Sequence, residues 1–148
     1  MPLRTSEETF RQLLELLLAK DMDAVADLWA EGGTAEFPFA VGTSPSRLNG
    51  REAVRGYLAG YPDLMDVQTI PTLTVRHTDQ PDTIVVEFTA DGRTVATDEP
   101  YQLDYITVVT THEGLITRYR DYWNPLAAAS AAGTLPELLG SLGEEATR

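Results

Sequence analysis

Apolar residues recur at helical spacing early in the chain and alternate with polar residues later. The first run repeats every three or four residues, at Phe10, Leu13, Leu14, Leu17 and Leu18. This spacing predicts a helix over residues 6–19, which the capping-box pair Thr5 and Glu8 begins. Further helices are predicted from about residue 21 to 29 and from residue 51 to about 60. A strand is predicted over 34–40, and residues 42–49 are typical of a loop.

The second half of the chain is typical of strands. Four β-rich runs cover residues 67–77, 83–90, 101–111 and 115–123, with turn sequences between them. Helices followed by antiparallel strands predict an α+β fold, in which the helices pack on one face of a curved sheet. At 148 residues we expect one domain, 1–148. The tail from residue 126 is predicted to form one or two short helices, and residues 134–148 to be mobile.

Composition excludes several classes of protein. With 11 basic and 23 acidic residues the net charge is −12, which disfavours binding to nucleic acid or to an anionic membrane surface. The chain has no cysteine and two histidines, so we expect no disulfide, thiolate or built-in metal site. No nucleotide-binding motif, membrane span or signal-peptide core is evident, so we expect a cytoplasmic protein that uses no cofactor.

The last predicted strand carries the clearest candidate for chemistry. Period-two alternation places Thr117, Tyr119, Asp121 and Trp123 on one face of the strand. Asp121 therefore lies between two aromatic residues, and burial there would raise its pKa into the working range of a general acid or base. The alternative is a structural Asp121 that is hydrogen-bonded in the sheet or paired with a cross-strand arginine.

Two neighbouring strands offer partners for Asp121. Glu87 lies in a strongly apolar strand, where it is either on a solvated face or reaches a cavity. Tyr105 shares a face with Leu103 and Thr107, and its hydroxyl could meet a bound carbonyl group. The alternative for Tyr105 is a core aromatic residue with its hydroxyl at the rim.

Three short segments carry a family resemblance. They are Tyr61-Pro62-Asp63, the Val86-Glu87 pair and the run Arg120-Asp121-Tyr122-Trp123-Asn124-Pro125. With the order of elements over residues 8–135, they resemble the SnoaL-like group of the nuclear-transport-factor-two-like (NTF2-like) superfamily. Within that group, the phenazine-biosynthesis A/B proteins are the most similar. Those proteins carry a histidine in the third helix, where this chain has Arg51 and Arg55, which disfavours phenazine chemistry itself.

The resemblance implies a cone-shaped, cystatin-like α+β barrel. A curved sheet, antiparallel or mixed, would wrap around the three N-terminal helices and enclose an apolar pocket. The resemblance also implies a homodimer formed through the outer face of the sheet. Asp121, Glu87 and Tyr105 are then the expected catalytic residues. The expected substrate-binding residues are Trp29, Phe37, Thr89, Leu103, Tyr119 and Trp123.

This pocket predicts a cofactor-independent acid–base enzyme of secondary metabolism, such as antibiotic biosynthesis. The substrate would be a small apolar carbonyl compound, such as a polyketide-like intermediate. The reaction would be a cyclisation, isomerisation, dehydration or condensation. The alternative is a non-catalytic module of the same fold, which binds a small ligand or mediates dimerisation.

Overall fold

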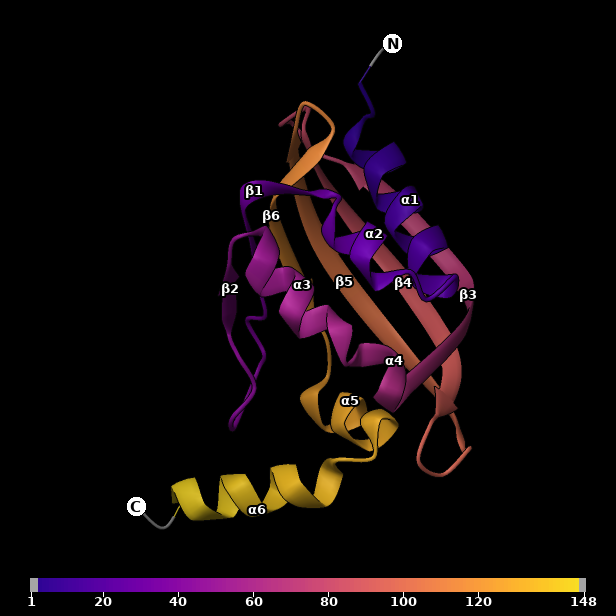
Figure 1. Ribbon diagram of the computed structural model, residues 1–148, viewed down its shortest axis with the longest axis vertical. Coiled ribbons are helices and arrows are strands. Elements are labelled where there is room, and N and C mark those ends of the chain that lie inside the picture. Colours follow the sequence, from indigo (N-terminus) through magenta and orange to yellow (C-terminus); the bar gives the residue numbers. More distant parts are fainter. Residues whose placement is uncertain (1–2, 147–148) are drawn as a thin grey trace.

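The computed structural model describes residues 3–146, and a strongly curved six-stranded sheet organises them (Figure 1). The strand order is β2-β1-β6-β5-β4-β3, and neighbouring strands are antiparallel except for the parallel pair β1 and β6. The strands are β1 (Trp29–Glu36), β2 (Arg47–Asn49), β3 (Met65–His77), β4 (Thr83–Thr94), β5 (Pro100–His112) and β6 (Leu115–Tyr122). The sheet is therefore mixed, and it stays open, with β2 and β3 at its edges.

The helices lie over the concave face of the sheet and across one of its ends (Figure 1). They are α1 (Ser6–Leu18), α2 (Met22–Ala26), α3 (Arg51–Ala59), α4 (Tyr61–Leu64), α5 (Pro125–Ala132) and α6 (Leu135–Ala146). The predicted capping box begins α1: the Thr5 hydroxyl accepts from the Glu8 amide, and the Glu8 carboxylate accepts from the Thr5 amide. Within residues 3–146, no helix is long and apolar enough to cross a membrane.

Bulges bend the strands so that the sheet can wrap around the helices. The pairing of β3 with β4 shifts register twice between Val67 and Thr72, around Pro71. The pairing of β5 with β6 shifts at Thr117, so Ile116 and Tyr119 both face inward although they are three positions apart. Thr117, expected on the inner face, instead donates its hydroxyl to the Thr110 carbonyl oxygen at 3.2 Å.

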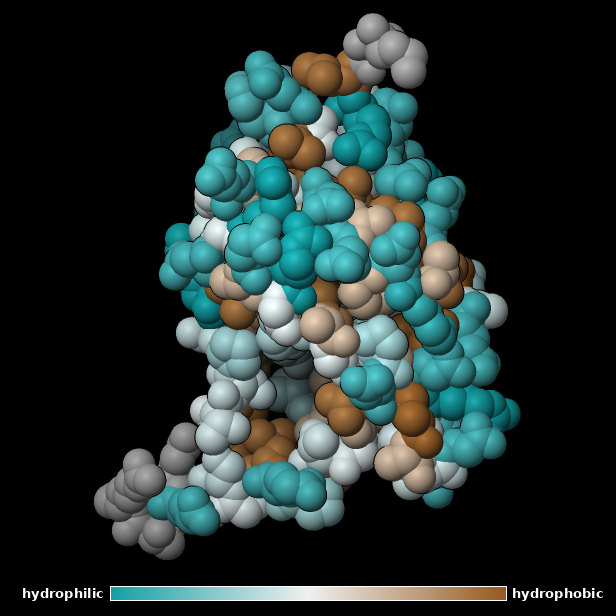
Figure 2. All heavy atoms as spheres, in the orientation of Figure 1, coloured by the Kyte–Doolittle hydropathy of each residue, from teal (hydrophilic) through white to brown (hydrophobic). Residues whose placement is uncertain are grey.

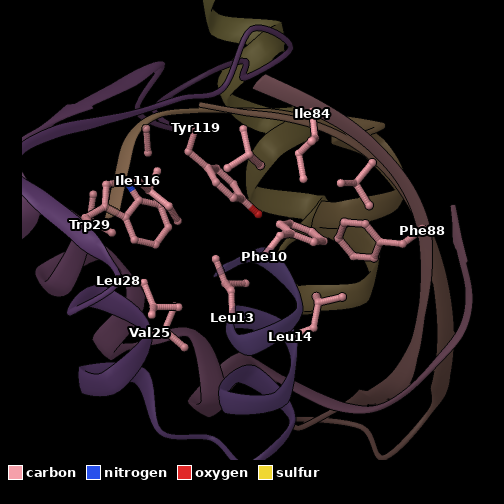
Figure 3. Packing of buried hydrophobic residues seen from close by; sticks show 14 of the residues in the cluster. Phe10, Leu13, Leu14, Val25, Leu28, Trp29, Ile84, Phe88, Ile116 and Tyr119 are labelled. Atoms are coloured by element: carbon pink, nitrogen blue, oxygen red, sulfur yellow. The ribbon is translucent and has the colours of Figure 1, made fainter. Parts of the chain in front are cut away.

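The hydrophobic core lies between α1, α2 and the concave face of the sheet. Phe10 of α1 is fully buried, and its ring contacts those of Phe88 and Tyr119 at centroid distances of 5.6 and 6.4 Å (Figure 3). Leu13 and Leu14 extend the same helix face, as the periodicity predicts (Figure 3). The core occupies one end of the concave face and leaves the other end for a cavity.

The predicted elements are confirmed apart from four regions. The strand expected at 83–90 continues through Asp91 and Gly92 to Thr94. The strand expected at 34–40 runs from Trp29 to Glu36, and the second helix ends earlier than expected, at Ala26. Gly33 permits this early strand start, because a Cβ atom there would lie 2.4 Å from the Ile116 carbonyl oxygen. The loop expected at 42–49 contains the short edge strand β2, which pairs with β1.

Candidate functional site

A cavity of about 410 Å³ opens between the concave face of the sheet and the helices. Apolar residues of α1, α3, α4 and β1 form most of its wall, and residues of α5 and α6 cover one end. Figure 2 shows a hollow above α6, which runs along the lower edge of the molecule in this view (Figure 1). Hydrophobic side chains lie at the floor of this hollow. This volume is within the range of small-ligand sites, about 300–1,000 Å³.

Asp121 is an acidic residue in the wall of this apolar cavity. It lies opposite Thr107 in the pairing of β5 with β6, and the Thr107 hydroxyl donates to Asp121 Oδ1 at 3.2 Å. Burial raises the pKa of Asp121 to about 7, and the Thr107 hydrogen bond only partly opposes that effect. The carboxyl group can therefore both accept and release a proton near neutral pH.

Aromatic rings surround Asp121, as the alternation in the last strand predicts. Tyr119 contacts the ring of Trp29 at 5.1 Å, and Trp123 meets Phe37 edge to face at 4.9 Å. Phe37 also stacks on Tyr57 at 5.2 Å, which joins α3 to this wall. These contacts hold the rings in place around the carboxylate.

A group of tyrosine hydroxyls lies on the side of the cavity formed by α4 and β5. Tyr61 and Tyr105 line the cavity, and burial is the main cause that raises the pKa of both. The charge of Asp121 raises both pKa values further, so both phenols lie within its electrostatic reach. They consequently remain protonated near neutral pH and are able to donate hydrogen bonds. Tyr101 lies behind them, and burial is the main cause that raises its pKa to about 12.

The structure brings most of the predicted site residues together. Those that line the cavity are Asp121, Tyr105, Trp29, Phe37, Tyr119 and Trp123. Leu103 is buried on the same side of the sheet but packs behind the cavity wall, against Met65 and Ala131.

Besides Leu103, two more predicted site residues do not line the cavity. Glu87 and Thr89 are on the outer face of β4, because Val86, Phe88 and Ala90 occupy the inward positions of that strand. Glu87 is about half exposed and pairs with Arg76 at 3.5 Å. Glu87 is therefore on a solvated face, which was one of its two expected positions. Thr89 does not reach the cavity either, and its hydroxyl donates to Asp104 at 2.7 Å.

Sequence reasoning missed the contributions of α3 and α4 and, in β5, that of Thr107. Tyr57 and Tyr61 line the cavity from the end of α3 and from α4, and Thr107 supplies the hydrogen bond to Asp121. The sequence signal for this part of the wall was the four-residue spacing between Tyr57 and Tyr61. Tyr61-Pro62-Asp63 was used for the family resemblance and gave no site residue, because its proline indicates a helix boundary and says nothing of where the Tyr61 side chain lies.

The C-terminal segment covers the mouth of the cavity. Thr134, Glu137, Leu138 and Ser141 contribute to the lining, and the side chains of Leu138 and Ser141 lie over Gly42. The two short helices predicted for this segment are confirmed as α5 and α6. The mobility expected for residues 134–148 stays a prediction, and residues 147–148 lie outside the described part of the chain.

Residues 3–146 contain no group of three or more His, Cys, Asp or Glu side chains placed to hold a metal ion. His77 and His112 are at strand ends and largely exposed. Their nearest acidic partners are Glu7, at 3.2 Å from His77, and Glu113, at 3.9 Å from His112.

Comparison with known proteins identifies the family. The model of the SnoaL-like domain matches residues 10–119. The chain belongs to the SnoaL-like family. The predicted resemblance to phenazine-biosynthesis A/B proteins is confirmed by the uncharacterized PhzA/B-like protein PA3332 of Pseudomonas aeruginosa. That SnoaL-like relative is 33% identical over 135 residues, which are 86% of this chain and 90% of the relative.

Solved structures confirm the SnoaL-like cone. A Bacillus subtilis protein provisionally named an isomerase has a TM-score of 0.83 and 38% identity, and the match covers 87% of this chain and 93% of that one. A Xanthomonas campestris protein provisionally named a polyketide cyclase has a TM-score of 0.70 and 21% identity, with coverage of 86% and 96%. At 21% identity the second likeness shows the fold alone.

The raised pKa of Asp121 predicts a loss of stability as the pH rises. The folded protein holds the Asp121 proton more tightly than the unfolded chain does. The free energy of unfolding therefore falls as the pH rises from the ordinary pKa of 3.8 to the raised pKa of about 7. From about pH 5 to about pH 8 we expect a loss of about 2–3 kcal/mol, which Asp121→Asn abolishes. Urea unfolding of both proteins at each pH measures the difference.

Glu36 and Asp66 do not interfere in this pH range. A hydrogen bond from Arg118 is the main cause that lowers the pKa of Glu36, and one from Lys20 is the main cause that lowers the pKa of Asp66. These two carboxylates therefore change the free energy of unfolding only at pH values below their ordinary pKa values of 4.5 and 3.8. Equal pH dependence of the wild type and the Asp121→Asn variant would show that Asp121 has an ordinary pKa.

Proposed function

We propose that the protein is a cofactor-independent acid–base catalyst that acts on a small apolar carbonyl compound in secondary metabolism. The observation that carries the proposal is a single carboxyl group, Asp121, in the wall of an apolar cavity with its pKa raised to about 7. A base with such a pKa is ionised often enough to take a proton near neutral pH and is protonated often enough to return it.

The proton transfer uses groups that line the cavity. Asp121 removes a proton from the carbon next to the substrate carbonyl group, and the electron pair moves onto the carbonyl oxygen. Tyr105 or Tyr61 donates a hydrogen bond to that oxygen, since both phenols are protonated and line the same cavity. Return of the proton to another atom completes an isomerisation. The same transfers accompany cyclisation, dehydration or condensation.

The apolar wall contributes to this chemistry in two ways. It binds the hydrocarbon part of a substrate, and it keeps water away from Asp121, so that the carboxylate remains a stronger base than in solution. The provisional isomerase name of the Bacillus subtilis neighbour, which is 38% identical, supports this reaction class.

Proton exchange tests the catalytic role of Asp121 without knowledge of the natural substrate. A cyclic apolar ketone such as 1-tetralone is incubated in D2O, and NMR follows the loss of the hydrogens next to its carbonyl group. We expect the wild type to accelerate the exchange and Asp121→Asn to lower the enzymatic rate by at least about 100-fold.

Glu113→Gln is the matched control, because it removes one exposed carboxylate from the turn between β5 and β6, away from the cavity and from the outer hollow. This variant is expected to retain the wild-type exchange rate. An active Asp121→Asn variant would contradict the proposal and favour a module that only binds its ligand.

We also propose that the protein is a homodimer that associates through the outer face of the sheet. Large apolar side chains are exposed there although the sheet covers an extensive core. Phe39, Ile106 and Leu126 are about half exposed and line one shallow hollow together with Tyr122. A second copy of the chain would bury these side chains.

Light scattering after size-exclusion chromatography tests the dimer. We expect wild-type protein at twice the mass of one chain, and Ile106→Glu at the mass of one chain, because a carboxylate would be buried in the interface. Val95→Glu changes an equally exposed apolar residue in the segment between β4 and β5 and should leave the dimer intact. A monomeric wild type would refute this association.

A further inference from the structure

Among residues 3–146, all charged side chains that line the cavity are acidic. Asp121 is in its wall, Glu137 of α6 lies at its mouth, and no lysine, arginine or histidine lines it. The arginines of β6 face away, where Arg118 and Arg120 donate to Glu36 at 3.1 and 2.9 Å. An anionic ligand would consequently meet no opposite charge in the cavity, whereas a cationic ligand would meet a carboxylate.

The Asp121 carboxylate has acceptor capacity that the described residues leave unused. Its Oδ1 atom accepts a hydrogen bond from Thr107, and no described donor reaches its Oδ2 atom. A carboxylate has about four acceptor positions. Because Asp121 lines the cavity, the remaining positions are available to a donor on a ligand.

The aromatic side chains around Asp121 suit the same kind of ligand. The rings of Trp29, Phe37, Tyr119 and Trp123 line the cavity near the carboxylate. The faces of aromatic rings attract cations, most strongly where water is excluded. An ammonium group with apolar substituents would then meet both a counter-charge and a matching apolar wall.

We infer that the cavity binds small apolar amines in their ammonium form, with an N–H group that donates to the carboxylate of Asp121 and an apolar body against the aromatic wall. This binding does not require the proposed reaction. It occupies the same carboxylate, so an amine is expected to compete with a carbonyl substrate.

Three probes that share a phenyl ring test the inference by isothermal titration calorimetry at about pH 8. N,N-dimethylbenzylamine is cationic, N,N-dimethylbenzamide is neutral and phenylacetate is anionic. We expect the amine to bind at least about tenfold more tightly than the amide, as a charged hydrogen bond implies, and phenylacetate to bind most weakly. An amide that binds as tightly as the amine, or a preference for phenylacetate, would overturn the inference.

Variants assign the preference to one side chain. Asp121→Asn should remove the advantage of the amine over the amide, whereas Glu113→Gln, which removes the same charge from the turn between β5 and β6, should preserve it. An unchanged advantage in Asp121→Asn would overturn the inference. If that variant does not fold, the comparison of the three probes on the wild type still decides.

The pH dependence gives an independent readout on the wild type. Burial raises the pKa values of the hydroxyls of Tyr57, Tyr61 and Tyr105 on neighbouring elements and of Tyr119 on β6 itself. The charge of Asp121 raises these pKa values as well, so the four hydroxyls stay neutral at these pH values. Besides Asp121, the only acidic side chain among the described residues that line the cavity is Glu137 of α6. Amine affinity should therefore fall as the pH is lowered and Asp121 takes up its own proton, while amide affinity should not fall. Equal pH responses of the two ligands would contradict the inference.

The outcome is distinguishable from that of the proposed catalysis. Amine binding that depends on Asp121, without ketone exchange, would support the inference and refute the enzyme. Ketone exchange that depends on Asp121, without a preference for the amine, would support the enzyme and refute the inference.

Discussion

The alternation of side chains along β6 is the constraint on which the site depends. In this strand Arg118 and Arg120 face outward and are held by Glu36, while Tyr119 and Asp121 face the cavity. The outward ion pairs and the inward aromatic contacts resist a shift of one residue, because such a shift would bury the arginines and expose the rings. Asp121 is thereby kept in an apolar environment although it costs stability there.

This cost is typical of a functional site. A buried carboxylate with one hydroxyl donor destabilises the folded protein relative to an amide of the same size, and a packing requirement alone would not select it. Glu36 shows how the same fold stabilises a partly buried carboxylate that has a structural role, since three arginines pair with it. The contrast between the two acids supports a role for Asp121 in chemistry or in binding.

The sequence predicts the elements and the faces of the strands well, because period and turn chemistry are local properties. In β4 the alternation makes Ile84, Val86 and Phe88 the more apolar face and therefore favours an outward Glu87. Only the family resemblance placed Glu87 among the catalytic residues, and it lies outside the cavity. The tyrosine wall and the cover formed by α6 are tertiary features. Tyr61 reaches Tyr105 only because α4 folds back onto the sheet, and no local pattern encodes that contact.

Direct titration of Asp121 is the most decisive measurement of this account. A 13C-labelled aspartate sample gives a carboxyl resonance that the Asp121→Asn variant identifies by its absence. The account predicts that this resonance titrates with a midpoint of about 7. A midpoint close to the ordinary value of 3.8 would show that the carboxylate is solvated, and it would contradict both the proposed proton transfer and its physical basis.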